Sequence, residues 1–392
     1  MTVDAPALPQ DPPASRRARF ASLRVSQVRR LTADSIEVTF EVPAELEQEF
    51  SYVPGQYIAV RTTLEGQQLR RSYSICAEPV PGELRIAIKR DIGGLFSTWA
   101  NEHLQAGDVL EVMNPSGAFI SKTAMTSLNS PEKVAADALA GRTGVRLAAF
   151  AAGSGITPIM AIIRTVLATS PDASFDLVYA NRSATDVMFA EEIGDLKDRC
   201  PRRFAVHHVL SREQRLNPLF TGRLDAEKLG VLLDEVLLTE QTDEWFLCGP
   251  FELVQLVRDE LSARGVPAEK VRFELFTTGR PDRPTGHQGR TVEADPGGKS
   301  LAIEFTLDGL TGKVESPVAA RETVLNAALR SRSDVPFACA GGVCGTCRAK
   351  VLCGEFEMEE NYALEPEELD AGYVLTCQTR PTSDKLVVDY DA

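Results

Sequence analysis

The sequence predicts a multidomain protein with three folded parts: an antiparallel β-barrel, a doubly wound α/β domain with a parallel sheet, and a small α+β domain. Short alternating runs of apolar and polar residues recur from about Phe20 to Ile120. From Val145 the pattern changes to strands that alternate with helical runs, and a cysteine-rich loop between strand-like runs follows near the end. A length of 392 residues suits two or three domains of ordinary size.

The first part, which we place at residues 19–121, contains runs with the alternation of half-buried strands. Pro-Gly or Gly-Asp pairs separate several of these runs, as expected for the tight connections of an antiparallel barrel. The predicted strands are Ser35–Val42, Tyr57–Thr63, Arg71–Cys76, Glu83–Lys89 and Val109–Met113, and a helix is predicted at Ser97–Leu104.

The second part, residues 145–276, alternates strands with helical runs, which implies a parallel sheet covered by helices. Its predicted strands are Arg146–Ala152, Phe175–Ala180, Phe204–Leu210 and Trp245–Cys248. The polar, irregular residues 122–144 before it indicate an insertion or linker, and residues 277–299 after it form a linker by composition.

The third part, residues 300–392, starts with a hairpin-like pair at Ala302–Leu307 and Lys313–Glu315. A predicted helix at Thr323–Leu329, the cysteine loop and closing strands follow. At the other end of the chain, residues 1–18 are rich in Pro and Ala. Their Arg16-Arg17 pair precedes no apolar core, so we expect a disordered tail rather than an export signal.

The charge and apolar pattern excludes some partners. The chain carries a net charge of −14, and from Leu301 onward 16 acidic and 8 basic residues stand together. Nucleic-acid binding needs a basic surface, so we expect none. No apolar run reaches the length of a membrane span, so we expect no membrane contact and a cytoplasmic protein. The acidic end is either an ordinary solvated surface or a docking surface for a basic partner.

Four cysteines have the spacing of an iron–sulfur site. Cys339, Cys344 and Cys347 follow the pattern C-x₄-C-x₂-C, and Cys377 lies on a later strand-like run. This is the plant-type pattern for a [2Fe–2S] cluster, in which one tight loop supplies three thiolates. The alternative is a structural zinc site, but such sites pair C-x₂-C with a second C-x₂-C or with histidines, and the sequence has no second half of that kind.

A glycine-containing turn joins the first predicted strand of the α/β domain to a helix. Gly153 and Gly155 would let a pyrophosphate approach the backbone, while the helix N-terminus supplies free N–H groups. Thr157 and Pro158 have the chemistry of an N-cap and the first helical residue. Pro158 replaces the third glycine of the usual dinucleotide motif, so a turn that binds no ligand stays open as an alternative.

Two further features of this domain bear on a nucleotide. Cys248, Gly249 and Pro250 end the fourth strand, at the edge where open α/β sheets bind ligands, although a free cysteine there is also an ordinary buried residue. Arg182 follows the second strand, and Ser211 and Arg212 follow the third, which supplies cations and hydroxyls for a ribose 2′-phosphate.

The same two loops favour NADPH over NADH, because no acidic residue for a free 2′-hydroxyl directly follows the second strand. A structural alternative also exists. Ser211 with Gln214, and Ser183 with Asp186, read as helix capping boxes.

The barrel part carries a polar, aromatic strand. Arg71, Tyr73 and Ser74 offer a cation, a ring and a hydroxyl, which suit a flavin and its phosphates. Gly94 and Ser97 stand at the start of a helix, where a pyrophosphate could meet N–H groups. Taken alone, Tyr73 could also be an ordinary strand aromatic.

In this order the motifs resemble the ferredoxin–NADP⁺ reductase superfamily fused to a C-terminal plant-type [2Fe–2S] ferredoxin domain. The resemblance extends from about Phe20 to Ala392, apart from the insertion before Gly144. It implies an FAD-binding barrel, an NADP-binding α/β domain and a ferredoxin domain of the β-grasp type.

The resemblance also implies roles for the motif residues. Arg71 and Ser74 would bind the phosphate and ribitol of FAD, and Tyr73 would stack on the flavin ring. Cys248 would lie near the hydride path, and Glu274 with Phe276 would close the reductase unit beside the flavin. The remaining implied contacts are Gly94 and Ser97 to the FAD pyrophosphate, and Gly153, Gly155, Thr157 and Pro158 with Arg182, Ser211, Arg212, Gly249 and Pro250 to the nicotinamide nucleotide.

The acidic stretch from Met358 to Gln378 is most similar to the reductase components of phenylacetyl-CoA epoxidases, which are di-iron oxygenases of aromatic catabolism. Reductases of Rieske oxygenases such as ketosteroid 9α-hydroxylase are built alike. The expected function is electron transfer from NAD(P)H through FAD and [2Fe–2S] to an oxygenase. A non-enzymatic iron–sulfur sensor or a zinc-bearing module are alternatives of other classes, and the paired nucleotide motifs speak against the first.

Overall fold

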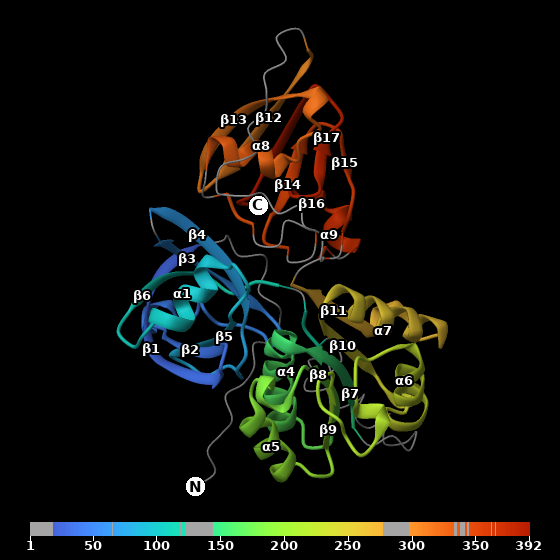
Figure 1. Cartoon of the computed structure of the whole chain (residues 1–392). Helices are drawn as coiled ribbons and strands as arrows, with labels where there is room; N and C mark the ends of the chain where they lie inside the picture. Colours follow the sequence, from blue (N-terminus) through green and yellow to red (C-terminus); the bar gives the residue numbers. More distant parts are fainter. Residues whose placement is uncertain are drawn as a thin grey trace.

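Three β-sheets, each built from one stretch of the chain, organise the computed structural model (Figure 1). The structure describes residues 19–64, 66–117, 119–121, 144–276, 298–332, 335–337, 342, 345–361, 363–364 and 366–392. The predicted tail, most of the insertion and most of the linker before residue 298 lie outside this description. In the described part, no helix combines the length and apolar character needed to cross a membrane.

The first sheet is an antiparallel barrel with strand order β4-β3-β6-β1-β2-β5. Its strands are β1 (Phe20–Thr32), β2 (Ser35–Glu41), β3 (Tyr57–Leu64), β4 (Gln67–Ser74), β5 (Glu83–Lys89) and β6 (Val109–Met113), with helix α1 (Leu95–His103) against β5. Alternation predicted all of these strands except β1. In β1, two register shifts and exposed arginines break the alternation of apolar and polar residues. The strand is held in the barrel by the fully buried apolar side chains of Leu23 and Val25.

Strand β4 begins and ends earlier than predicted. It covers Gln67–Ser74 rather than Arg71–Cys76, and Ile75 forms only an isolated bridge to Ile86. The pairing of β4 with β3 runs the full length of both strands, from Tyr57 opposite Ser74 to Leu64 opposite Gln67. Ser74 is therefore the last strand residue, at the end of the barrel that meets the second sheet.

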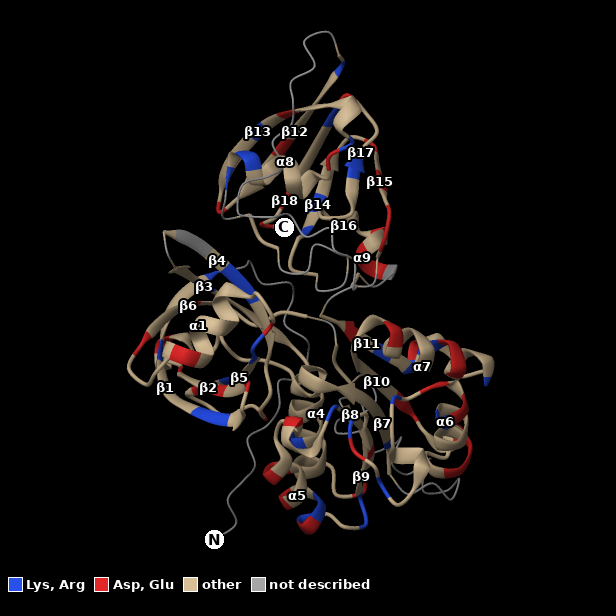
Figure 2. Ribbon diagram, viewed as in Figure 1, with Lys and Arg blue, Asp and Glu red and all other residues tan. Residues whose placement is uncertain are grey.

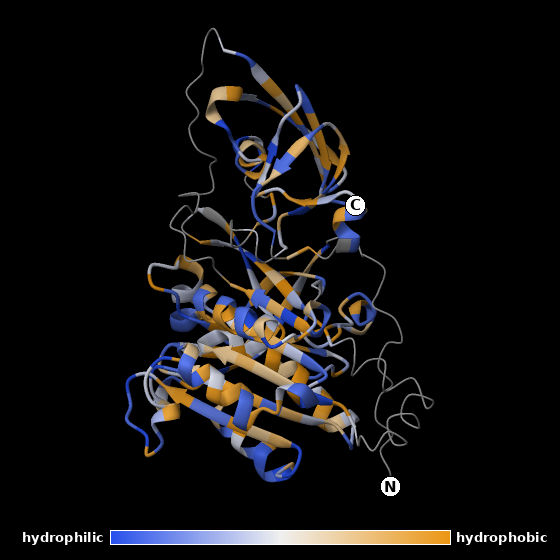
Figure 3. Cartoon of the chain, turned by 90° about the vertical axis from the view of Figure 1, so that its right-hand side faces the viewer, coloured by the Kyte–Doolittle hydropathy of each residue, from blue (hydrophilic) through white to orange (hydrophobic). Residues whose placement is uncertain are grey.

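The second sheet is parallel throughout, with order β11-β10-β7-β8-β9. The strands are β7 (Arg146–Ala152), β8 (Ser174–Asn181), β9 (Phe204–Leu210), β10 (Glu244–Gly249) and β11 (Val271–Leu275); the helices are α4 (Ile156–Thr169), α5 (Ala190–Arg199), α6 (Ala226–Val231) and α7 (Phe251–Ala263). Helices α4 and α5 line one apolar core, and α6 and α7 line the other, so both faces are covered. Figure 3 shows the apolar strands of this lower half of the molecule in orange.

The order of this sheet has a functional consequence. The chain proceeds outward from β7 through β8 to β9, then returns to place β10 and β11 on the other side of β7. Ligands bind open α/β sheets at such a reversal, beyond the carboxyl ends of the strands. Here that point lies between the ends of β7 and β10, where Gly153 and Cys248 are found.

The third sheet is mixed and has the order β13-β12-β18-β14-β16. Its strands are β12 (Ser300–Leu307), β13 (Leu310–Pro317), β14 (Arg348–Cys353), β16 (Tyr373–Leu375) and β18 (Lys385–Asp389), beside a small sheet of β15 (Phe356–Met358) and β17 (Thr379–Pro381). Helix α8 (Val324–Ser331) packs on β12 and β13, and α9 (Pro366–Asp370) packs on β16. With the first and last strands parallel in its centre, this domain has the predicted β-grasp form.

Helix α8 begins at Val324, one residue after the predicted start, and ends at Ser331 rather than Leu329. Thr323 is its N-cap, and the Thr323 hydroxyl accepts a hydrogen bond of 3.3 Å from the Asn326 backbone N–H. The buried face of α8 then covers the sheet.

Candidate functional site

The barrel and the parallel sheet meet at Ser74 and Glu274. The Ser74 hydroxyl, at the end of β4, donates a hydrogen bond of 3.1 Å to Oε2 of Glu274 on β11. Desolvation by the surrounding protein raises the pKa of Glu274 from 4.5 to about 7, and the bond from Ser74 opposes that rise. A carboxyl with this pKa can gain or lose a proton near neutral pH.

Cys248 completes this junction from the neighbouring strand. It stands in register with Glu274 on β11 and with Ala151 on β7. Its side chain is fully buried, and burial followed by the Glu274 charge raises the pKa of the thiol well above its usual range. The thiol is therefore neutral at physiological pH, so Cys248 is a small buried side chain and not a nucleophile.

Two aromatic residues that the sequence singled out lie near the junction. Phe276 packs against the apolar core that also contains Cys248 and Cys76. The Tyr73 ring lies 5.8 Å from the Phe96 ring, centroid to centroid. The fold therefore brings Ser74, Cys248, Glu274 and Phe276 to one boundary between the two sheets, whereas the Tyr73 ring packs on the core of the barrel.

The glycine turn lies at the N-terminus of α4. Gly153 has a φ of 53°, and a Cβ on Gly155 would lie 2.1 Å from the Cys248 carbonyl oxygen, so only glycine fits there. Gly155 is the N-cap of α4, which corrects the prediction for Thr157 and Pro158. These two residues lie inside the first turn, where proline costs no hydrogen bond. The Thr157 hydroxyl donates 3.0 Å to the Ser154 carbonyl.

The turn leaves room for a nucleotide at the end of β7. No heavy atom lies within 4 Å of a Cβ built on Gly153. The first N–H group of the 14-residue helix α4, that of Ile156, bonds to the Gly153 and Ser154 carbonyls, so it closes the turn. Tyr179 of β8 stabilises the turn, because its hydroxyl donates a hydrogen bond of 3.0 Å to the Gly153 carbonyl. Gly249 packs against Ala152, and Pro250 is the N-cap of α7.

The barrel offers a second helix N-terminus. Helix α1 begins at Leu95 with Gly94 as its N-cap, two residues before the predicted start at Ser97. A Cβ on Gly94 would lie 2.6 Å from Ser97 Oγ, and Ser97 Oγ accepts a 3.0 Å bond from the Asp91 N–H. Ser97 thus fixes the loop before the helix. The Arg71 guanidinium donates a hydrogen bond of 2.7 Å to the Arg70 carbonyl, so the side chain lies against its own strand, β4, which also carries Tyr73.

The two loops after β8 and β9 lie side by side. The Arg212 N–H donates a hydrogen bond of 2.7 Å to the Arg182 carbonyl, and the Ser211 N–H donates one of 2.9 Å to the Asn181 carbonyl. Both guanidinium-bearing residues are exposed, so the pair forms a cationic rim. Sequence reasoning missed Glu213, whose Oε1 accepts 2.6 Å from the Ala184 N–H and ties the loops together.

The capping-box alternative for these loops is wrong. No helix begins at Ser211 in the structure. Ser183 precedes a single 3-10 turn, but its hydroxyl donates 2.6 Å to the Asp186 carboxylate and caps no N–H group. That bond is the main reason why the pKa of Asp186 is lowered.

The third domain brings two of the four predicted cysteine ligands together; Cys339 and Cys344 lie outside the described residues. Cys347 and Cys377 are 2% and 5% exposed and share one apolar core. The Thr376 N–H and hydroxyl both donate hydrogen bonds to the Cys347 carbonyl, of 3.1 and 2.8 Å. These two bonds join the strand before Cys377 to the loop that carries Cys347.

Gln378 adds a donor to this cysteine pair. The side-chain nitrogen Nε2 of Gln378 lies 3.7 Å from Cys377 Sγ, and it also donates a hydrogen bond of 3.1 Å to the Cys377 carbonyl. Side-chain N–H donors to sulfur are a usual feature of iron–sulfur sites. Gly345, with a φ of 65°, provides the left-handed backbone of the loop before Cys347.

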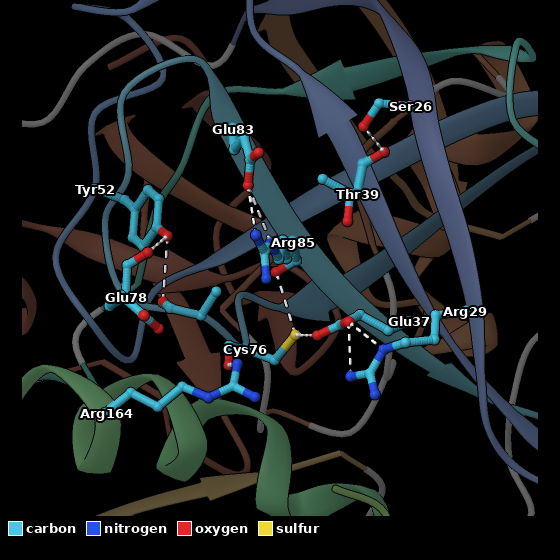
Figure 4. Close-up of polar contacts among 11 residues, drawn as sticks. Ser26, Arg29, Glu37, Thr39, Tyr52, Cys76, Glu78, Glu83, Arg85 and Arg164 are labelled. Carbon is cyan, nitrogen blue, oxygen red and sulfur yellow. Dashed lines mark hydrogen bonds and ion pairs between the residues drawn. The ribbon is translucent and has the colours of Figure 1, made fainter. Parts of the chain in front are cut away.

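A polar cluster between the barrel and α4 was not foreseen from the sequence (Figure 4). The Arg164 guanidinium of α4 donates 2.9 Å to the Cys76 carbonyl, and it lies 5.3 Å from the centre of the Phe189 ring. Cys76 follows Ser74 by two residues, so this contact joins the helix of the glycine turn to the end of β4.

Arg29 and Glu37 continue the cluster inside the barrel. The Arg29 guanidinium donates two hydrogen bonds, of 3.0 and 2.9 Å, to the Glu37 carboxylate, and it also forms an ion pair with Glu192 of α5. The Cys76 thiol lies 3.8 Å from Glu37 Oε1, and burial raises the pKa of this thiol, which keeps it protonated. The barrel is therefore held to the α/β domain by charged bonds at several points.

Comparison with known proteins agrees with this architecture. Residues 22–120 match the oxidoreductase FAD-binding domain, residues 150–259 the oxidoreductase NAD-binding domain, and residues 305–382 the 2Fe-2S iron-sulfur cluster binding domain. The fold resembles that of phthalate dioxygenase reductase, with a TM-score of 0.54 and 21% identity over 94% of this chain and 98% of the other.

Two curated relatives extend along nearly the whole chain. The chain is 40% identical to one component of the 1,2-phenylacetyl-CoA epoxidase of Escherichia coli K12, over 95% of this chain and 98% of that protein. It is 32% identical to the ferredoxin reductase component of 3-ketosteroid-9-alpha-monooxygenase of Rhodococcus rhodochrous, over 95% and 97%. The chain therefore belongs to the family of NAD(P)H-dependent oxidoreductases that join an FAD-binding, an NAD-binding and a [2Fe–2S] ferredoxin domain in one polypeptide.

Proposed function

We propose that this chain is the reductase component of a phenylacetyl-CoA epoxidase, a di-iron oxygenase. The observation that carries the proposal is full-length similarity, at 40% identity, to a component of that enzyme in Escherichia coli, together with the three cofactor domains. Identity to the ketosteroid monooxygenase reductase is lower, at 32%. We propose domain limits of 19–121, 145–276 and 300–392, which enclose the three sheets.

The residues at the two sheet boundaries fit the two nucleotides. Arg71, Tyr73 and Ser74 would hold the flavin, with its pyrophosphate at Gly94 and Ser97. The nicotinamide nucleotide would lie over Gly153 and Gly155, with Thr157, Pro158, Gly249 and Pro250 at the edge of its site. FAD supplies the chemistry of accepting a hydride and releasing its electrons one at a time.

The chain's own groups would orient that hydride transfer. Ser74 and Glu274 approach from opposite sheets, and the neutral Cys248 thiol lies beside them. Phe276 packs on the apolar core at this boundary, and the Tyr73 ring packs on the barrel core beside Phe96. Glu274, with a pKa of about 7, can hold a proton at Oε2 or release it near neutral pH.

NADPH is the proposed coenzyme, in preference to NADH. The exposed residues Arg182 and Arg212 come from loops joined by backbone bonds, and Ser211 adds a hydroxyl. This rim suits the dianionic 2′-phosphate. The test compares kcat/KM for NADPH and NADH, with Arg212→Gln expected to weaken NADPH use alone.

The cluster ligands are proposed to be Cys339, Cys344, Cys347 and Cys377. Cys347 and Cys377 are buried together, and Gln378 supplies an N–H group toward sulfur, which suits a thiolate-ligated cluster. A cluster held this way accepts and donates single electrons.

The partner would dock on what we call the acidic edge, which consists of Glu355, Glu357, Glu359, Glu367 and Asp370. These side chains are exposed along β15 and α9, where Figure 2 shows acidic residues in red. Leu352, Phe356 and Leu369 are exposed among them, at 57%, 38% and 40%. Arg321 and Arg380 pair with Glu357 and Glu359, so the five acidic residues keep an excess of negative charge. Such a surface suits a basic partner, and electron delivery should slow as salt rises.

The function is tested by replacing one ligand. In Cys377→Ser, NADPH should still bleach the flavin, whereas electron transfer to the oxygenase components of the epoxidase should fall by at least a hundredfold. Cys353→Ser, which changes an exposed cysteine, is the matched control and should keep full transfer. Transfer that survives in Cys377→Ser would contradict the proposal. If the chain passes electrons to a Rieske oxygenase but not to the epoxidase, the proposed partner would change to the kind of oxygenase that the second relative serves.

A further inference from the structure

The ferredoxin domain rests on the barrel through a neutral hydroxyl pair. Thr346 Oγ1 and Ser72 Oγ lie 2.8 Å apart, although the two residues are 274 positions apart in sequence. Thr346 immediately precedes Cys347 and is only 7% exposed. Next to it, a Cβ on Gly345 would lie 3.9 Å from the Tyr57 hydroxyl of β3. We call these ferredoxin residues, Gly345 and Thr346, the docking face.

The docking face meets the strand that also carries the hydride site. Ser72 and Ser74 are two positions apart on β4, so their side chains point to the same side of the strand. Ser74 bonds to Glu274, and Ser72 bonds to Thr346. One side of β4 therefore contacts the α/β domain at its end and the ferredoxin domain about 7 Å further back.

A second face of the ferredoxin domain stays open in this arrangement. The Glu359 N–H donates a hydrogen bond of 3.1 Å to the carbonyl of Gln378, the residue after Cys377, which places the middle of the acidic edge beside that cysteine. Helix α9, with Glu367, packs on β16, two residues before Cys377. The acidic edge is thus next to Cys377, whereas the docking face directly precedes Cys347 in the chain. The acidic edge is exposed while the ferredoxin domain is docked.

We propose that the two faces work at the same time: the ferredoxin domain stays docked on the barrel through Ser72 and Thr346 while the partner binds the acidic edge. The partner then needs no release of the docking face to receive electrons. This inference rests on the proposed reductase function and identifies which surface the partner uses.

A covalent lock on the docking face tests the proposal. In a Cys353→Ser background, Ser72→Cys and Thr346→Cys place two thiols where the hydroxyl oxygens are 2.8 Å apart. Oxidised glutathione or a short bis-maleimide should join them, and mass spectrometry after alkylation should show the link in most molecules. The single variant Ser72→Cys is the control. If neither reagent joins the pair, the docking contact is wrong.

The locked holoprotein is then given NADPH and the basic haem protein cytochrome c as a one-electron acceptor. One NADPH and two ferric haems yield NADP⁺, one proton and two ferrous haems. We expect the locked chain to reduce cytochrome c within about twofold of the same chain before linking. A loss of tenfold or more that dithiothreitol reverses in the disulfide form would overturn simultaneous use of the faces, while leaving the reductase function intact. A reduced, unlinked chain that fails to reduce cytochrome c would instead contradict the proposed function.

Binding supplies a measurement that does not depend on turnover. At low salt, the locked and unlocked chains should bind ferric cytochrome c with equal Kd. Glu357→Gln with Glu367→Gln on the acidic edge should weaken that binding several-fold in both forms. The matched control is Glu315→Gln, an exposed glutamate on β13 at the other edge of the same sheet. Tighter binding by the unlocked chain, or an equal effect of Glu315→Gln, would overturn the assignment of the acidic edge.

Discussion

The Ser74 hydroxyl donates a hydrogen bond of 3.1 Å to the Glu274 carboxylate across 200 positions of sequence. Ser74 is the last residue of β4 and Glu274 the next-to-last residue of β11, so the bond exists only when the barrel and the α/β domain are assembled. The flavin and nicotinamide motifs stand on the two sides of this bond. Under the proposed function, domain assembly and hydride transfer would depend on the same few residues.

Glu274 should make stability depend on pH. Because its pKa rises from 4.5 to about 7 on folding, the folded chain holds the proton more tightly than the unfolded chain. The free energy of unfolding should therefore fall as pH rises from about 4.5 to 7, by at most about 3 kcal/mol. Glu274→Gln removes this loss, so the variant should match the natural chain at pH 4 and exceed it at pH 8.

Denaturant midpoints at the two pH values measure this effect. The exposed glutamate in Glu240→Gln provides the control, with no pH-dependent difference expected. A Glu274→Gln chain that is less stable than the natural chain at pH 8 would show that the carboxylate form is favoured in the folded state.

Gly155 should tolerate no larger residue. A Cβ there would lie 2.1 Å from the Cys248 carbonyl oxygen and 2.8 Å from the Gly249 nitrogen, both backbone atoms that cannot turn away. Gly155→Ala should cost about 1–3 kcal/mol or more of stability and weaken NADPH binding. The control Gly194→Ala, in helix α5 with open space around it, should instead gain about 0.5–1 kcal/mol. Thermal unfolding and nucleotide titration would distinguish the two, and similar behaviour of both variants would refute the close approach.

Arg164 should couple the α4 helix to the flavin strand. Its loss removes the 2.9 Å bond to the Cys76 carbonyl and leaves that buried acceptor without it. Arg164→Gln should raise KM for NADPH and cost about 1–3 kcal/mol, and Arg164→Lys should recover part of both. The exposed Arg202→Gln is the control. Steady-state kinetics with unchanged KM in Arg164→Gln would mean that the contact plays no part in placing α4.

Gln378 should tune the cluster. Its Nε2 lies 3.7 Å from Cys377 Sγ, and a donor to sulfur stabilises the extra electron of the reduced state. Gln378→Leu should lower the reduction potential by roughly 20–60 mV, the equivalent of one hydrogen bond for a one-electron couple. Potentiometric titration followed by electron paramagnetic resonance measures it, with Gln255→Leu on α7 as control. A potential that stays the same or rises would contradict this role.

Much of the fold could be predicted because the alternation is local. Strands β6, β7 and β9 have the predicted bounds, since each is a short apolar run between turn residues. Strand β1 was missed because only the tertiary contacts of Leu23 and Val25 bury it. The start of α4 was misplaced because Thr157 resembles an N-cap, whereas the close packing of Gly155 on β10 sets the helix start.

The site divides in the same way. Sequence motifs singled out Ser74, Cys248 and Glu274 because their neighbours follow a recognisable pattern, and the structure places the three side by side. The contacts of Ser72 with Thr346 and of Arg164 with Cys76 carry no such pattern. They link residues that are 274 and 88 positions apart, so only the assembled chain reveals them.

Electrons should pass within this one chain from NAD(P)H through FAD to a [2Fe–2S] cluster. Anaerobic titration of the purified holoprotein with NADPH, followed by absorbance and electron paramagnetic resonance, examines that relay without any partner present. We expect one FAD and two irons with two acid-labile sulfides per chain, flavin bleaching, and the signal of a reduced [2Fe–2S] cluster that disappears in Cys347→Ser. A chain that binds FAD and is bleached by NADPH, yet holds no acid-labile sulfide and shows no such signal, would contradict the relay.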